Sequence, residues 1–555
     1  MTTGVVSRRN APLLALGLVT LAAIGLELYI ARNLTFYQDT WAFLLDRRSF
    51  SVDSLLVPHN EHIVLIPVLL QQLLLNLFGM TSAWPEYVLL ALMEGATAVL
   101  LFVYVRRRTG AWVALAFATL LLFIGPAWET LLWPFEICFV GSILFGIAML
   151  LALEREDQRG DILACAFLLI AIGFNSLGLA FAVGAAVDVS LRRRERGWSR
   201  AYLVGIPLLL YAGWYLGWGH EAGNSITLDS AFAAPRYVLD CFAVALQSLL
   251  GLSSAIPGKK VPDPSWGRAL AVGFFGLVAF GLWRRPRIDQ RLWPALAIAL
   301  TYWTLAGLNQ SIARQPTTSR YIYATAAVTL LIAANLPWGV RFGKRALVVV
   351  GVVTAVAVFS NLGIMRDGAS YLRNQAVLTK ADLGAVEIAR PSINPAFRPN
   401  GPSAGTGGLI NVEAGKYFEA IDEYGSPAYT ADELTSAPAP AAHYADLVLA
   451  TALEFSTETE LGTYSASGGA GSCVDFEGAE LALTPGTTQI EVAPGPHADF
   501  SLRRFSTNEY PVSTEGAPGD STTRLLIRPD SAPQPWYLQV EAQQPVRVCH
   551  LNPGK

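Results

Sequence analysis

The feature that most constrains this chain is a series of long apolar segments separated by short, arginine-rich loops, which continues as far as Ile364. Apolar segments of about 20 residues can cross a bilayer. A composition with 53% hydrophobic and only 15% charged residues agrees with a multi-span membrane protein. The remainder, residues 365–555, is rich in Pro, Gly, Ser and Thr and has no apolar run of span length. We therefore predict a transmembrane domain over residues 1–364 and a soluble domain over residues 365–555.

The arginine clusters predict how the spans are oriented, because short positively charged loops stay on the cytoplasmic side. Keeping every cluster inside requires the apolar segments 63–78 and 237–252 to lie along the interface or to re-enter, so that about eleven spans remain. Arg8 and Arg9 place the N-terminus inside, so an odd number of spans places the soluble domain outside, at the plasma membrane. The clusters lie at residues 8–9, 106–108, 192–200, 284–287 and 341–345. The net charge of −3 shows no basic excess, so nucleic acid is not an expected partner.

Most polar side chains outside the arginine loops then fall on the outer side. Ionisable groups gathered at one face of a membrane protein usually mark a site for a polar ligand or reaction. Glu94, by contrast, lies in the middle of the span 87–105 and is expected to face the helix bundle. The outer candidates are Asp39, His59, Glu61 and His62 in the first loop, Glu129 and Glu136 in PAWETLLWPFE, and Arg320 and Tyr321 in NQSIARQPTTSRYIY.

Three of these segments resemble a known family, the GT-C glycosyltransferases. They are FYQDTW at residues 36–41, PHNEH at 58–62 with the amphipathic segment after it, and SRY at 319–321. At the level of layout the resemblance covers residues 10–365, and it implies a GT-C-like helical fold that binds a polyprenyl-phosphate sugar carrier from the membrane. The sugar would be transferred on the outer face to an acceptor glycan, lipid or protein. Many members have paired acidic residues in the first loop, whereas Asp39 stands between Gln38 and Thr40, so a divalent cation as cofactor stays open.

The chemistry of glycosyl transfer asks for two kinds of side chain. A carboxylate must take the proton of the acceptor hydroxyl, and a cation must stabilise the phosphate as it leaves. Asp39 is predicted to be this base and Arg320 to bind the phosphate, since the planar fork of an arginine donates two parallel hydrogen bonds. Tyr321 could contribute at the same place by offering a face to the sugar ring.

Each assignment has a structural alternative. Asp39 could cap the surface helix expected at 40–46, and Arg320 could be an interface anchor. His59, Glu61 and His62 contain the spacing H-x-x-H but too few ligands for a metal site, so they fit a structural polar cluster or the wall of the site. Glu129 and Glu136 could be solvated or aromatic-belt residues, or one of them could line the site.

The soluble domain shows alternating runs such as RLLIRP and PWYLQVEA bounded by Gly and Pro, which predict a small β-sandwich after a helix near 441–453. Its two cysteines, Cys473 and Cys549, are predicted to form a disulfide, which an extracytoplasmic location would permit. Two other functions stay open for the whole chain. One is a transporter or flippase of a lipid-linked or polar solute, which would carry ionisable groups at mid-depth. The other is a non-catalytic assembly protein of the cell envelope.

Overall fold

The structure is a computed structural model with two compact units. The bundle unit comprises residues 1–33, 47–74 and 84–372, and the C-terminal unit comprises residues 34–46, 75–83 and 373–555. The residues described are 10–192, 197–223, 226–254, 263–284, 288–311, 313–336, 343–399, 408–461, 473–476, 480–483, 489–492, 498–507, 512–515, 521–542 and 546–551.

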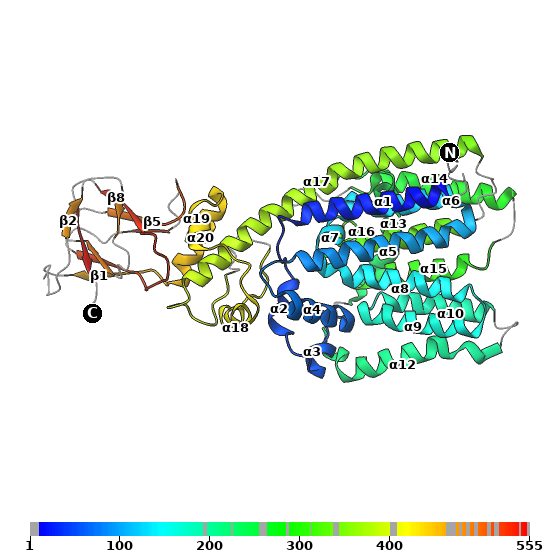
Figure 1. Ribbon diagram of the computed structural model, residues 1–555, viewed down its shortest axis with the longest axis horizontal. Helices are drawn as coiled ribbons and strands as arrows, with labels where there is room; N and C mark the ends of the chain where they lie inside the picture. The colour runs from blue at the N-terminus through cyan, green and yellow to red at the C-terminus, as the bar shows by residue number, and fades with distance from the viewer. Residues whose placement is uncertain are drawn as a thin grey trace, which may run out of the picture. The chain divides into compact units, whose positions relative to one another are not determined.

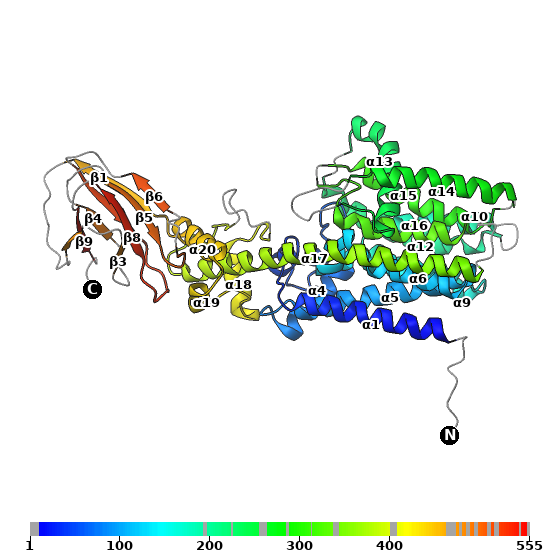
Figure 2. The same ribbon diagram turned by 90° about the horizontal axis from the view of Figure 1, so that it is seen from above.

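The bundle unit is built mainly of helices; α1 and α5 run side by side in both ribbon views (Figure 1, Figure 2), and α8 packs against α5. Two helices, α4 and α17, continue into the C-terminal unit at their C-terminal ends. The helices are α1 Ala11–Ala31, α3 Val52–Leu56, α4 Leu65–Phe78, α5 Trp84–Thr109, α6 Ala111–Leu122, α7 Trp128–Leu132, α8 Ile137–Leu153, α9 Gln158–Phe174, α10 Gly178–Leu191, α12 Tyr202–Gly217, α13 Leu228–Leu249, α14 Ser265–Arg284, α15 Leu292–Leu308, α16 Ser319–Ala334 and α17 Lys344–Ile388.

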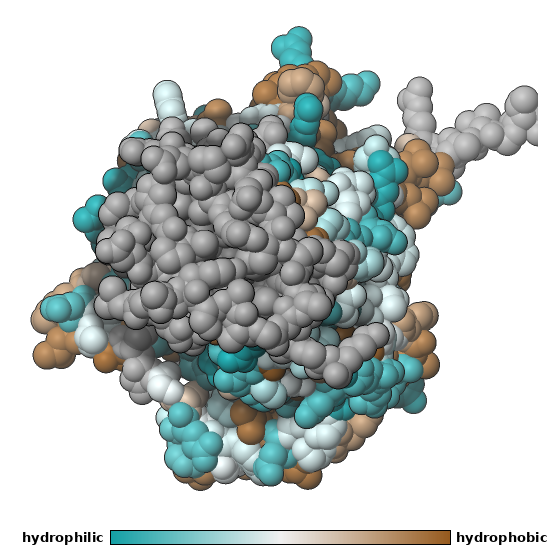
Figure 3. Space-filling view, turned by 90° about the vertical axis from the view of Figure 1, so that its left-hand side faces the viewer, coloured by the Kyte–Doolittle hydropathy of each residue, from teal (hydrophilic) through white to brown (hydrophobic). Residues whose placement is uncertain are grey.

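Five helices in the described part of the chain are long and apolar enough to cross a membrane, or six if α6 and the bent segment Gly125–Leu132 form one broken span. Five shorter apolar helices accompany them: α4, α10, α12, α15 and α16. Large apolar side chains such as Leu18, Phe275 and Phe359 are exposed, as expected where helices face lipid. Figure 3 shows hydrophobic side chains at the surface along the edges of the view. The predicted fold class, a multi-span helical membrane protein with C-terminal strands, is confirmed.

Two helices are longer than hydropathy predicted. α13 begins at Leu228, nine residues before the expected segment, because Thr227 and Ser230 form a capping box. Thr227 Oγ1 accepts the Ser230 N–H at 3.1 Å, and Ser230 Oγ accepts the Thr227 N–H at 3.0 Å. α17 runs through the expected domain boundary at residue 364 and ends at Ile388.

Glu94 of α5 is buried inside the bundle, as predicted, and its neighbour across the α1–α5 contact is Glu27 of α1, which is also buried. Two carboxyl groups that interact away from water cannot both stay ionised at low cost. This interior pair is a feature of the helix packing that hydropathy alone does not show.

The C-terminal unit combines short helices with two antiparallel sheets. Its helices are α2 Thr40–Asp46, α18 Ala414–Tyr424, α19 Ala431–Thr435 and α20 Ala439–Ala452. α2 has the predicted bounds, but it is not the predicted surface helix, because side chains such as Trp41 and Leu44 are buried. The sheets have the strand orders β1-β7-β4-β9-β2 and β3-β8-β5-β6. The strands are β1 Ser456–Leu461, β2 Cys473–Phe476, β3 Leu481–Ala482, β4 Gln489–Val492, β5 Ala498–Arg503, β6 Val512–Glu515, β7 Ser521–Leu526, β8 Tyr537–Ala542 and β9 Val546–Leu551.

A buried carboxylate joins the helices of this unit to the strands. Asp446 of α20 accepts the backbone N–H groups of Arg504, Phe505 and Ser506 at 2.9 to 3.0 Å and the Ser506 hydroxyl at 2.8 Å. The chain leaving β5 is therefore fixed to α20, because these bonds satisfy three successive backbone donors.

The register of β2 and β9 places Cys473 opposite Cys549. Directly opposed residues of an antiparallel pair have Cα atoms about 4.5 or 5.5 Å apart, within the range that disulfides span. The two side chains lie outside those that the structure describes, so the disulfide stays a prediction.

Candidate functional site

The PHNEH segment folds into a tight hairpin turn. His59 and His62 exchange both backbone hydrogen bonds, each at 3.0 Å, with Asn60 and Glu61 between them. Asn60 has a φ of 51°, in the left-handed region that asparagine tolerates better than most residues. The turn therefore fixes Glu61 at its tip and His62 directly after it.

Side chains of the bundle unit hold this hairpin in place. The buried guanidinium of Arg47 donates to the carbonyl oxygens of Val57 at 2.9 Å and Pro58 at 2.8 Å. Gln72 of α4 donates to the Arg47 carbonyl at 2.8 Å. From the other side, the Trp214 indole of α12 donates at 2.7 Å to the last carbonyl of α3. These hydrogen bonds therefore fix the position of the loop that carries the hairpin.

Glu61 forms an ion pair with Arg314, which lies in the loop between α15 and α16. Both guanidinium Nη atoms bond the two carboxylate oxygens, Nη2 to Oε2 at 3.0 Å. The side chains are 20% and 25% exposed, so the pair is only partly screened by solvent. Burial acts to raise the pKa of Glu61, but the hydrogen bonds and charge of Arg314 outweigh it, and this pKa is lowered. Glu61 is therefore ionised at neutral pH.

His62 beside this pair is neutral. Burial is the main cause that lowers its pKa to about 4, the Glu61 carboxylate opposes it, and the charges of Arg314 and His59 add to it. A neutral imidazole has one nitrogen that donates and one that accepts a hydrogen bond. His62 can therefore bind a hydroxyl group without adding charge to the site.

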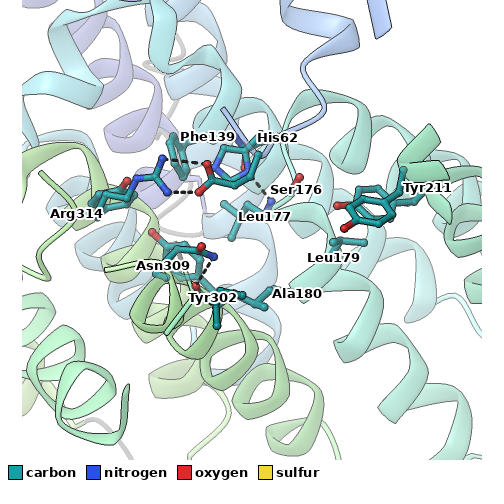
Figure 4. A pocket seen from close by; sticks show the side chains of 17 residues that line it. His62, Phe139, Ser176, Leu177, Leu179, Ala180, Tyr211, Tyr302, Asn309 and Arg314 are labelled. Atoms are coloured by element: carbon teal, nitrogen blue, oxygen red, sulfur yellow. Dashed lines mark hydrogen bonds and ion pairs between the residues drawn. The ribbon is translucent and has the colours of Figure 1, made fainter. Parts of the chain in front are cut away.

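Glu61, His62 and Arg314 line a cavity of about 350 Å³ (Figure 4). The hairpin and the α15–α16 loop contribute the charged groups, whereas α8, the break between α9 and α10, α12, α15 and α16 supply the remaining walls. At this break, the Oδ1 atom of Asn175 accepts the Leu177 N–H at 2.9 Å. The other lining residues are Phe139, Asn175, Ser176, Leu177, Leu179, Ala180, Tyr211, Tyr215, Ile226, Tyr302, Leu305, Ala306, Asn309 and Tyr321.

The cavity wall has two chemically different parts. His62 Nδ1 and Asn309 Oδ1 lack a hydrogen-bond partner within the described chain. The hydroxyl groups of Ser176 and Tyr302 interact with Tyr211 and Thr325, and each can form a further hydrogen bond. Another part of the wall is apolar and exposed: Ile226 is 50% and Leu305 42% exposed. A cavity of this kind suits an amphipathic ligand, because polar groups left without partners favour a ligand that can bond them.

Arg320 lies at the start of α16, next to the cavity-lining Tyr321. Its Nη2 donates to the Ala313 carbonyl at 3.2 Å, and its guanidinium carbon lies 5.6 Å from the centre of the Tyr321 ring. Glu129 of α7 accepts the Arg320 backbone N–H at 3.1 Å, and the Glu129 N–H donates to Ser319 Oγ at 3.0 Å. Glu129 therefore satisfies a free N–H of the first helical turn and positions Arg320.

The other predicted site residues lie as follows. The His59 ring is 5.1 Å from the Phe135 ring, centre to centre. Glu136 is buried in a short 3₁₀ helix, Pro134–Glu136, directly before α8. Asp39 belongs to the C-terminal unit, where it is half-buried and its carbonyl accepts the Ala42 N–H at 3.2 Å at the start of α2. The structure thus brings Glu61, His62 and Tyr321 together, and the pairing of Asp39 with Arg320 stays a prediction.

Sequence reasoning missed the most direct charged contact of the cavity. Arg314 precedes Arg320 in the same outer segment of the sequence. Because this loop has no helical or strand periodicity, the sequence does not show which arginine faces the hairpin. Tyr302 and Asn309 were hidden because they interrupt an otherwise apolar span. Their spacing of seven residues, two helical turns, is the signal that could have placed them on one face of α15.

A metal site is not defined by the described residues, among which no three His, Cys, Asp or Glu side chains are grouped closely enough to hold an ion. The H-x-x-H spacing of His59 and His62 is explained in the structure by their backbone pairing in the hairpin. The need for a divalent cation stays open.

No family model matches the chain, and no curated protein matches its sequence. Among solved structures, the chain is similar to ArnT from Cupriavidus metallidurans, determined with bound undecaprenyl phosphate. The two sequences are 14% identical, the match covers 77% of this chain and 91% of that chain, and the TM-score is 0.44. A similarity at this level carries no argument about function, which has to come from the site.

Proposed function

We propose that this chain is a membrane glycosyltransferase that takes a sugar from a polyprenyl-phosphate carrier and transfers it to an acceptor glycan, lipid or protein on the outer face of the plasma membrane. The observation that carries the proposal is the cavity, which joins a cation, several uncommitted polar atoms and an exposed apolar wall. A polyprenyl-phosphate sugar has the same three chemical parts. Membrane lipids would reach the apolar wall directly.

The parts of the carrier can be matched to the cavity in turn. The phosphate would bind Arg314, which has N–H groups beyond those that Glu61 accepts, with Arg320 next to it beside Tyr321. The sugar would lie against the polar atoms of α15 and the α9–α10 break. The prenyl chain would leave along the exposed apolar side, where Ile226 and Leu305 lie.

In the proposed reaction the acceptor hydroxyl attacks the anomeric carbon while the bond from this carbon to the phosphate oxygen breaks. The hydroxyl proton passes to a carboxylate, assigned to Asp39 on the sequence argument, and the polyprenyl phosphate leaves with the bonding electrons. Arginine stabilises the charge that grows on the leaving phosphate. Atoms and charge balance without any further reactant.

The test uses full-length protein in lipid nanodiscs and a polyprenyl-phosphate carrier with a radiolabelled sugar. Asp39→Asn should lower turnover by about 10²-fold or more with carrier binding retained, because it removes the proton acceptor and keeps the size. Asp46→Asn is the matched control: this carboxylate at the other end of α2 bonds Lys416 at 2.5 Å and should be dispensable for turnover. Transfer near the wild-type rate by the Asp39→Asn protein would contradict the assignment.

Arg320→Ala addresses the phosphate side of the same reaction. It should weaken carrier binding and turnover together, because a cation at the phosphate acts in both the ground and the transition state. Unchanged binding and turnover would instead support the interface-anchor role of Arg320.

One observation favours a second candidate, a transporter or flippase. The buried carboxyl pair of Glu27 and Glu94 lies inside the bundle, where transporters place groups that bind protons or ions. Translocation of a labelled lipid-linked sugar across proteoliposomes, abolished by Glu94→Gln, would support transport. Sugar transfer that survives Glu94→Gln without any translocation would favour the transferase.

A further inference from the structure

We propose that this cavity selects an uncharged, hydroxyl-rich sugar, and that Tyr302 of α15 and the α15 C-cap residue Asn309, with Ser176 and His62 from other elements, determine this specificity. The inference rests on the proposed function and deepens it, because it concerns which class of sugar the carrier bears. It is drawn from the charges and the uncommitted polar atoms of the cavity wall.

The charge of the wall leaves no counter-ion for a charged sugar. Among the described lining residues, the ionised side chains at neutral pH are Glu61 and Arg314, and they bond each other through both carboxylate oxygens. An ammonium group on the sugar would have to share the Glu61 carboxylate, whose charge Arg314 already neutralises. A carboxylate would compete with the carrier's own phosphate for Arg314. Either charge would otherwise stay unpaired in a partly buried cavity, which is costly.

The uncommitted polar atoms match hydroxyl groups. Asn309 Nδ2 donates to the Leu305 carbonyl at 3.3 Å, which leaves Oδ1 directed elsewhere as an acceptor. The hydroxyls of Tyr302 and Ser176 can donate or accept, and neutral His62 adds one further nitrogen. Sugar hydroxyls do both as well, so each wall atom can find a partner on a neutral sugar without any change of protonation.

Geometry and size point to a single sugar unit. Tyr302 lies in α15, Asn309 caps the C-terminal end of this helix seven residues later, and Ser176 lies at the break between α9 and α10. The cavity volume of about 350 Å³ is at the small end of the range for ligand sites. A monosaccharide with its phosphate is therefore the expected occupant, and a longer glycan is not.

The test measures binding of four synthetic probes to full-length protein in lipid nanodiscs. The probes are a short isoprenyl phosphate without sugar, and the same lipid phosphate bearing a neutral hexose, an amino sugar or a uronic acid. Wild-type protein should bind the neutral hexose probe about 10-fold or more tightly than either charged-sugar probe, in line with the cost of an unpaired charge. Equal binding of a charged-sugar probe would overturn the inference.

Variants of α15 locate the effect. Tyr302→Phe and Asn309→Ala should each weaken binding of the neutral hexose probe by about 3- to 10-fold, the value of one hydrogen bond, and leave the sugar-free probe unchanged. Thr304→Ala, which removes an exposed hydroxyl of the same helix outside the cavity, is the control and should change neither. Equal effects of Tyr302→Phe on both probes would refute the assignment to the sugar. If no probe bound at all, the proposed function would fail and the inference with it.

Discussion

The ion pair between Glu61 and Arg314 leads to the prediction that substitutions of the two residues change phosphate binding in opposite directions. If the carrier phosphate binds Arg314, then Arg314→Gln removes its cation, whereas Glu61→Gln removes the anion that partly neutralises this cation. Arg314→Gln should therefore weaken phosphate binding, and Glu61→Gln should strengthen it. If Glu61 and Arg314 had only a structural role in the cavity wall, both substitutions would weaken phosphate binding.

The magnitudes follow from the geometry of the pair. A hydrogen bond to a charged group is worth about 1.5 to 3 kcal/mol, so Arg314→Gln should weaken binding by roughly 10- to 150-fold. A phosphate beside Arg314 would lie about 6 Å from the Glu61 carboxylate, which corresponds to a repulsion of roughly 3 kcal/mol at an effective dielectric constant of about 20. Since Glu61 is 20% exposed, we discount this repulsion to about 1 to 2 kcal/mol, and Glu61→Gln should tighten binding by about 5- to 30-fold.

The assay is equilibrium binding of a lipid-phosphate diester, which carries one negative charge, to full-length protein in nanodiscs at neutral pH. Arg155→Gln serves as the control, because Arg155 pairs with Asp157 in an exposed loop outside the cavity. This substitution should leave binding of the diester unchanged. Weaker binding by Glu61→Gln, of the same size as that of Arg314→Gln, would refute the reasoning, because it would mean that Glu61 is needed to position the arginine.

The same pair predicts how binding responds to pH. The folded pKa of Glu61 is lowered from its ordinary value of 4.5, so the stability that the pair contributes is present above that value and is lost as the pH falls through the folded pKa. Glu61 therefore stays ionised between about pH 5.5 and 8, and binding of the diester should not change with pH in this range through titration of Glu61.

Three further predictions concern stability and redox state. Asn60→Gly should be tolerated, whereas Asn60→Val should lower the thermal unfolding temperature, because a β-branched residue at a φ of 51° costs about 1 to 2 kcal/mol; equal unfolding temperatures would argue against the turn. His62 has a folded pKa of about 4, below its ordinary 6.5, so the unfolded chain binds the extra proton first and stability should fall as the pH drops from 6.5 towards 4. Thermal scans should show this fall in the wild type and a smaller one in His62→Gln; equal pH dependence would be evidence against the buried neutral histidine. Thiol labelling of unreduced protein should find Cys473 and Cys549 blocked, and free thiols at both would exclude the disulfide, which the chain-entropy model values at roughly 3 to 5 kcal/mol.

The sequence predicted the apolar helices well because burial in lipid or protein leaves a strong hydropathy signal. The predicted span 87–105 lies within α5, and the predicted helix 40–46 has the same bounds as α2, although α2 is buried. The early start of α13 and the late end of α17 were missed for the same reason. Their extensions carry charged residues among apolar ones, which lowers the average hydropathy. A cap stabilises the α13 extension, and buried residues such as Leu372 stabilise that of α17.

Only part of the site was predictable from the sequence, and ionisable residues were easier to identify than uncharged ones. Glu61 and His62 stood out as ionisable groups in an outer loop, and Tyr321 through the SRY segment. Tyr302 and Asn309 carry no charge, so they change the average hydropathy of the surrounding apolar segment too little to be noticed. The choice of Arg314 as the partner of Glu61 depends on a tertiary contact across 253 residues, for which the local sequence holds no signal.

The two-residue turn between His59 and His62 also bears on how this loop can change in evolution. Surface loops usually accept insertions and deletions. An insertion here would shift the pairing by one residue and direct Glu61 away from Arg314. Gaps should therefore be excluded between His59 and His62, although they are allowed elsewhere in the first loop. A search that scores this fixed spacing, together with an arginine five residues before Ser319, could detect distant relatives whose overall identity is too low to align.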